Sequence, residues 1–150
     1  MREILLFIHI LAAGTWLGAN ATQVLVTPVM SRIGGSTAAA WMRQTVRMGV
    51  VLYTPAAVVA LLTGIFLVID GAEWEFEQFF VALGFVTVVV GGVLGARVFG
   101  PLGRQAADLH EGGNSHGAGA IQRKLAMWGL VDTALVVVTI YAMVEKLGAG

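Results

Sequence analysis

The sequence predicts an all-α membrane protein whose four transmembrane helices form an up-down-up-down bundle. Hydrophobic residues make up 57% of the 150 residues and charged residues 12%, about half the charged fraction of an ordinary soluble domain. Four apolar stretches are each close to the ~20 residues that an α-helix needs to cross the hydrocarbon core, and the alternating segments of a membrane β-barrel are missing. As one integral membrane domain, residues 1–150 are expected to form helices at about 4–30, 49–69, 79–98 and 125–144.

The charges predict the orientation of the bundle. Seven of the nine lysines and arginines lie in or beside the connections at residues 31–48 and 103–124. Short loops rich in these residues stay in the cytoplasm. The connection between the second and third stretches carries only acids, from Asp70 to Glu77. We therefore expect an N-out/C-out, multi-pass protein of a bacterial inner (plasma) membrane.

The ends of the helices follow from local signals. "GANA" at residues 18–21 offers a signal-cleavage pattern, but cleavage would strand residues 23–30 as half a span, so we expect a retained helix. Pro28 is expected to end or bend the first helix and Pro55 to kink the second. "LHEGGNSHGAG" at residues 109–119 predicts a flexible loop.

Glycines predict close helix packing and the kind of partner. Gly14 with Gly18, and Gly91 with Gly95, form GxxxG pairs, which let helix backbones approach closely in lipid. The expected partners are the lipid bilayer and either a second copy in a homodimer or a larger membrane complex. Nucleic acid is not expected, because the basic residues form no stripe. The chain has no cysteine, which excludes disulfides, thiolate ligands and iron–sulfur clusters.

The segment "FIHILAAGTWLGANATQ", residues 7–23, places polar groups inside an apolar helix. At 100° per residue these groups share one stripe, which should face the bundle because lipid cannot satisfy an imidazole or an amide. The one carboxylate well inside a span, on the fourth helix, lies at a similar depth. We expect a polar seam that is either structural glue between helices or a proton or ion relay. Its members are Trp16, Asn20, Gln23, Arg97 and Asp132.

His9 lies about 9 Å in from the outer end of the first helix, away from Asp132. An imidazole in an apolar pocket can donate a lone pair, so His9 is a candidate ligand for haem b iron or for copper. Tyr141 and Met143 lie at the same depth on the fourth helix and are the accompanying cofactor-binding candidates. The alternatives are His9 as the only ligand, His9 from two chains, and a histidine that bonds a hydroxyl group or water without any cofactor.

The motifs of the first two helices are similar to those of small four-helix bacterial membrane proteins. The shared elements are the early histidine in "FIHILAAGTWLGAN", the Trp-x-Gly of residues 16–18, and Pro55 followed by Thr-Gly at residues 63–64. The chain resembles the HemJ-type protoporphyrinogen oxidases, the membrane domain of CopD-type copper-resistance proteins, and an uncharacterised family with an ending like "YAMVEKLG". This resemblance implies a four-helix fold and His9 as a haem ligand.

The chain differs from HemJ proteins at two helix openings. "EQFFVALGF" lacks their basic residue, and "MWGLVD" stands where they carry a polar, proline-containing segment. An activity other than porphyrinogen oxidation therefore fits better. Three functions stay open: a membrane redox protein that holds haem b or a metal through His9, an accessory subunit of a respiratory or transport complex, and a small metal or proton transporter that uses His9 and Asp132.

Overall fold

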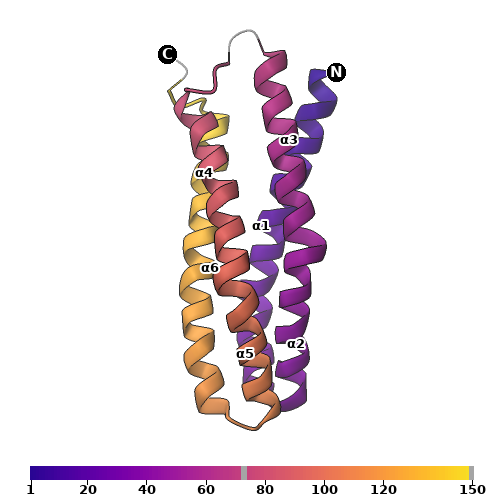
Figure 1. Cartoon of the computed structure of the whole chain (residues 1–150), viewed down its shortest axis with the longest axis vertical. Helices are drawn as coiled ribbons and strands as arrows, with labels where there is room; N and C mark the ends of the chain where they lie inside the picture. The colour runs from indigo at the N-terminus through magenta and orange to yellow at the C-terminus, as the bar shows by residue number, and fades with distance from the viewer. Residues whose placement is uncertain (72–73, 149–150) are drawn as a thin grey trace.

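The computed structural model describes residues 1–71 and 74–148 and folds them into four long helical rods that run antiparallel (Figure 1). The start of α1 and the end of α6 lie at the same end of the bundle. Each rod is long and apolar enough to span a membrane, which confirms the prediction of an all-α four-helix membrane bundle. The rods are α1 (Arg2–Ile33), α2 (Gly35–Met48) with η1 (Gly49–Tyr53) and α3 (Thr54–Asp70), α4 (Phe79–Leu94) with η2 (Gly95–Phe99) and α5 (Gly100–Glu111), and α6 (Ser115–Val144).

The rods are longer than the expected spans. They contain 32, 36, 33 and 30 residues, or about 45 to 54 Å of helix, against ~30 Å of hydrocarbon. The two stretches expected to be polar connections are helical, as α2 and α5, and short glycine turns with φ 73° at Gly34 and 74° at Gly113 join them to their neighbours. The prediction of connections rested on the lack of long apolar runs in these segments. Small residues, which form no such runs, pack α2 and α5 instead. The buried small residues are Ala38, Ala39, Ala106 and Ala107.

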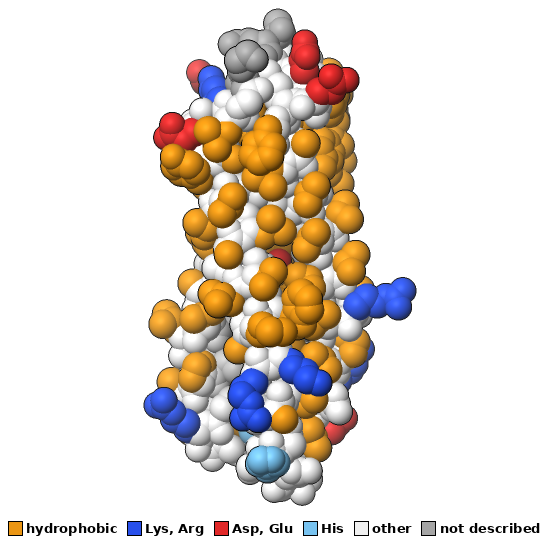
Figure 2. All heavy atoms as spheres, turned by 90° about the vertical axis from the view of Figure 1, so that its left-hand side faces the viewer, with side chains coloured by type: hydrophobic (Ala, Val, Ile, Leu, Met, Phe, Trp, Pro, Cys, Tyr) orange, Lys and Arg blue, Asp and Glu red, His pale blue; other side chains and the backbone are white. Residues whose placement is uncertain are grey.

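Charged residues give the bundle an acidic end and a basic end. The acidic end holds the start of α1, the end of α6 and the turn after α3, and the basic end holds α2, α5 and the start of α6. Figure 2 shows a broad belt of hydrophobic side chains between these charged groups. At the acidic end, the Arg2 guanidinium lies 4.3 Å from the centroid of the Trp74 ring. At the basic end, Arg43 pairs with Glu111 at 2.6 Å and with Asp108 at 3.7 Å.

Each interrupted rod has a π-helical turn just before a proline. η1 ends at Tyr53, two residues before Pro55, and η2 ends at Phe99, two residues before Pro101. Proline has no N–H, and its ring collides with the carbonyl group four residues earlier. A wider π turn relieves that collision. The kink expected at Pro55 therefore takes the form of a π turn, whereas Pro28 lies within α1 and does not end it.

Candidate functional site

Two apolar clusters lie near the ends of the bundle, and a buried polar cluster lies in its middle. One apolar cluster includes Phe80 at the acidic end, and another includes Met42 at the basic end. Between them, Asp132 of α6 is only 3% exposed and belongs to a rod that can span the membrane. A buried carboxyl group at that depth is costly unless other groups bond it. Its contacts therefore decide what the site can do.

The carboxyl group of Asp132 accepts two hydrogen bonds from α1, both at Oδ2. Trp16 Nε1 donates at 3.1 Å and Asn20 Nδ2 donates at 2.8 Å. Within residues 1–71 and 74–148, no hydrogen bond reaches Oδ1 and no cation forms a salt bridge with Asp132. All partners of the carboxyl group are thus neutral, and one of its oxygens stays free.

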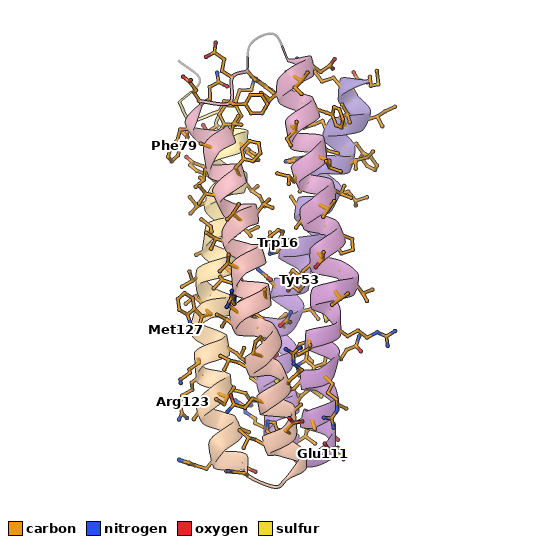
Figure 3. All side chains as sticks on the ribbon, in the orientation of Figure 1. Trp16, Tyr53, Phe79, Glu111, Arg123 and Met127 are labelled. Atoms are coloured by element: carbon orange, nitrogen blue, oxygen red, sulfur yellow. The ribbon has the colours of Figure 1, made fainter. Side chains whose placement is uncertain are left out.

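A second layer of side chains orients the Asn20 amide. The hydroxyl group of Tyr53, the last residue of η1, donates to Asn20 Oδ1 at 2.7 Å and accepts from Gln23 Nε2 at 2.9 Å. The Trp16 and Tyr53 rings meet edge to face, with centroids 6.2 Å apart, and Figure 3 shows both side chains in the middle of the bundle. Because Tyr53 occupies the amide oxygen of Asn20, the amide nitrogen is directed at Asp132.

A glycine of α4 makes room for this cluster. A Cβ atom on Gly91 would lie 2.3 Å from Trp16 Cζ2, so the close approach of α4 to the indole requires glycine there. The other three glycines of the two GxxxG pairs have no such role within the bundle. Nothing lies within 4 Å of a Cβ atom placed on Gly14, Gly18 or Gly95.

The structure brings together four of the five residues expected in the polar seam. Trp16, Asn20 and Asp132 bond directly, and Gln23 joins them through Tyr53. Arg97 lies in η2 with an exposed side chain and forms no ion pair in the part of the chain that the structure describes. Tyr53 was not predicted to belong to the polar seam. What could have indicated it is a hydroxyl group within an apolar run.

His9 is directed at α3. Its Nδ1 lies 2.9 Å from Thr63 Oγ1, and the Thr63 hydroxyl group donates its own proton to the Val59 carbonyl oxygen at 2.6 Å. The imidazole is therefore the donor to Thr63, and its Nε2 keeps a lone pair. The ring also packs against Gly64, where a Cβ atom would lie 3.3 Å from His9 Cε1.

The other two cofactor-binding candidates face different surroundings. The Met143 methyl group points at α4, where a Cβ atom on Gly84 would lie 2.7 Å from it, and Tyr141 is 59% exposed. Among the described residues, no hydrogen bond joins either side chain to His9, and no three acidic or histidine side chains are arranged for a metal ion. A cofactor site formed by His9, Met143 and Tyr141 stays a prediction, with His9 directed at α3, Met143 at α4 and Tyr141 exposed.

Towards the basic end, the stripe of α1 continues beyond Gln23 with polar contacts. Thr27 Oγ1 accepts a hydrogen bond from an indole of α2 at 3.0 Å, and Ser31 Oγ accepts from Gln122 Nε2 at 2.6 Å. The same Gln122 nitrogen lies 3.0 Å from His110 Nε2. Polar side chains of α1 therefore bond a neighbouring helix about once per turn from the Asp132 cluster to the basic end.

The fold and this cluster define a small four-helix, multi-pass membrane protein with a buried polar centre. No protein-family model, no curated protein and no solved structure matches the chain. Its function is therefore inferred from the geometry of the bundle.

Proposed function

We propose that this protein is a small proton transporter that binds and releases a proton at Asp132 inside the membrane. The observation that carries the proposal is the environment of the carboxyl group, which is buried, has only neutral partners and keeps Oδ1 free. A proton can enter or leave Oδ1 while both hydrogen bonds to Oδ2 remain. Ionisable groups in this position are typical of proton pathways.

A purely structural role would not require an acid at position 132. Buried structural carboxylates usually pair with a lysine or an arginine, whereas Arg97 is exposed. An asparagine at this position would accept the same two hydrogen bonds from Trp16 and Asn20. What the acid adds is the capacity to carry a proton.

The contacts of α1 favour proton exchange with the basic end. Thr27 and Ser31 continue the polar stripe in that direction, about one helical turn apart. Towards the acidic end, about 10 Å of α1 separates Trp16 from His9, and the hydroxyl group of Thr15 in that interval bonds its own helix. Under the orientation expected from the charges, the basic end is cytoplasmic.

Proton flux into liposomes tests the proposal. Purified protein is reconstituted with a trapped pH-sensitive dye, and a potassium diffusion potential drives the flux. We expect wild type to exceed empty liposomes and Asp132→Asn to lower the flux about a hundredfold, because an amide cannot take up the proton. Asp70→Asn removes an exposed carboxylate at the acidic end and should leave the flux unchanged.

Two results would contradict proton transport: equal flux from wild type and Asp132→Asn, or wild-type flux no higher than that of empty liposomes. Thermal unfolding in detergent, followed by tryptophan fluorescence, shows whether the variant is folded. Because asparagine can accept both hydrogen bonds, Asp132→Asn should unfold close to the wild-type temperature.

A second candidate function is membrane redox chemistry with haem b or copper held by His9 alone or by His9 of two copies. It is favoured by the hydrogen bond to Thr63, which fixes the imidazole and leaves Nε2 free, as histidine ligands require. This is the function that the resemblance to HemJ-type and CopD-type proteins implies. It predicts a haem spectrum or bound copper that is lost in His9→Ala and kept in His116→Ala. Colourless, copper-free wild type from haem-replete cells would remove this candidate.

An accessory role in a larger membrane complex is favoured by one different observation. Gly14 and Gly18 are exposed on α1 with open space beside them, so another transmembrane helix could pack there. This role predicts stoichiometric co-purification with a partner that Gly18→Leu disrupts. If Gly18→Leu leaves the co-purification unchanged, a partner does not pack against Gly14 and Gly18 of α1.

A further inference from the structure

An apolar groove lies on the lipid-facing side of the bundle, between α1 and the segment formed by η1 and α3. Its volume is about 230 Å³. The side chains that line one wall are Ile8, Leu11 and Thr15, and those that line the other are Val51, Leu52, Pro55 and Val59. The one hydroxyl group in the lining, that of Thr15, already donates to the Leu11 carbonyl oxygen. The groove therefore offers an occupant no free polar side chain.

The floor of the groove separates it from the polar cluster. Ala12 of α1 and Ala56 of α3 line the groove and are buried, so their small side chains leave the space open. Val51 and Leu52 also line it and belong to η1, the same π turn that carries Tyr53 on its inner side. One short segment thus touches both the groove and the cluster.

A free cation lies just beyond the groove, towards the basic end. Arg47 precedes Val51 by four residues, about 6 Å along the helix axis. Its side chain is exposed and has no ion pair or hydrogen bond in the described ranges. Arg43, one turn further on, differs because Glu111 and Asp108 pair with it. The groove and the unpaired charge of Arg47 follow one another on the same rod.

We propose that the groove and Arg47 bind one anionic phospholipid of the surrounding bilayer. An acyl chain fills the groove, because hydrocarbon is the phase around this part of each rod, and the lipid phosphate lies at Arg47, whose guanidinium suits phosphate geometry. Arg47 and Val51 are about one helical turn apart, and this distance leaves room for the glycerol backbone of the lipid. The bound chain supports η1, and through it the position of Tyr53. Lipid binding at this site does not depend on proton transport at Asp132.

Native mass spectrometry of the purified protein, incubated with equal amounts of phosphatidylglycerol and phosphatidylcholine, tests the charged half of the site. Wild type should retain phosphatidylglycerol preferentially. Arg47→Gln should lower its affinity for phosphatidylglycerol about fivefold, the effect of one basic residue at a membrane surface. Arg97→Gln, which removes another exposed arginine on the other hairpin, should change nothing.

A bulky side chain tests the apolar half. Val59→Trp places an indole in the groove and should reduce retention of both lipids, whereas Val89→Trp, at an exposed position of α4 outside the groove, should not. Equal losses for Arg47→Gln and Arg97→Gln, or wild-type retention by Val59→Trp, would overturn the proposal. So would a wild-type protein that retains no lipid. Unfolding scans of all four variants show that each comparison concerns folded protein.

Discussion

Gly91 of α4 lies against Trp16, one of the two α1 residues that donate to Asp132. Gly91→Ala would place a methyl group 2.3 Å from Cζ2 and 2.5 Å from Cη2 of the indole, so the ring must move and its hydrogen bond to Oδ2 is lost. We expect a destabilisation of about 1–3 kcal/mol from overpacking and from the unpaired indole N–H of Trp16. Unfolding in detergent, followed by tryptophan fluorescence, measures it.

The neighbouring glycine is the control for this substitution. Nothing lies within 4 Å of a Cβ atom on Gly92, so Gly92→Ala should be neutral or stabilising by up to ~1 kcal/mol, because alanine is the better helix former. Equal destabilisation by Gly91→Ala and Gly92→Ala would show that the contact with Trp16 does not limit helix approach.

The polar side chains near Asp132 show which side-chain directions could be predicted from the sequence. From Trp16 to Gln23 the chain is a regular α-helix, so counting 100° per residue predicts one inner stripe of polar side chains on α1, and these side chains bond α6 and η1. Tyr53 and Arg97 both lie in π turns. A π turn breaks the 100° count, so the direction of these two side chains could not be read from periodicity.

At the scale of elements, η1 and η2 lie where the polar helices α2 and α5 join the apolar helices α3 and α4. A π turn holds about one residue more than an α turn. Removing one residue from η1 should therefore leave α3 in register with α2, whereas removing one from α3 rotates everything after it by about 100°. In a Pro55→Ala background, which removes the ring collision, we expect deletion of Val50 to be tolerated and deletion of Val58 not.

Size-exclusion chromatography and an unfolding scan distinguish these two deletions. Val50 and Val58 are both exposed valines on the same rod, so the loss of side-chain contacts is similar and the difference reports the helical register. Two deletion variants that fold equally well would mean that η1 does not absorb the extra residue.

The number and order of the membrane-spanning rods were predictable because each contains a predominantly apolar stretch long enough to cross the hydrocarbon core. Their length was not. Ala38, Ala39, Ala106 and Ala107 form buried contacts between α2 and α5, and alanines between charged residues resemble a loop when only hydropathy is followed. Small side chains pack well because they let two helices approach closely, a property of the pair that neither segment reveals alone.

At the scale of the whole molecule, the bundle is longer than a bilayer is thick, so part of it must project into water. We expect the basic end to be the projecting part, because Arg43 pairs with Glu111 there and small residues fill the core. The acidic end closes just above the apolar belt, with Arg2 over Trp74. The charge bias predicts that the basic end faces the cytoplasm.

The absence of cysteine from the chain makes this orientation testable by single introduced thiols. Glu75→Cys and Ser36→Cys place an exposed thiol at the acidic and the basic end, and Val89→Cys places one in the apolar belt. A membrane-impermeant maleimide should label Glu75→Cys in intact spheroplasts and Ser36→Cys only after lysis. Val89→Cys should stay unlabelled throughout, because a thiolate does not form in hydrocarbon. The reverse pattern would put the basic end outside, and proton exchange at Asp132 would then face the external medium.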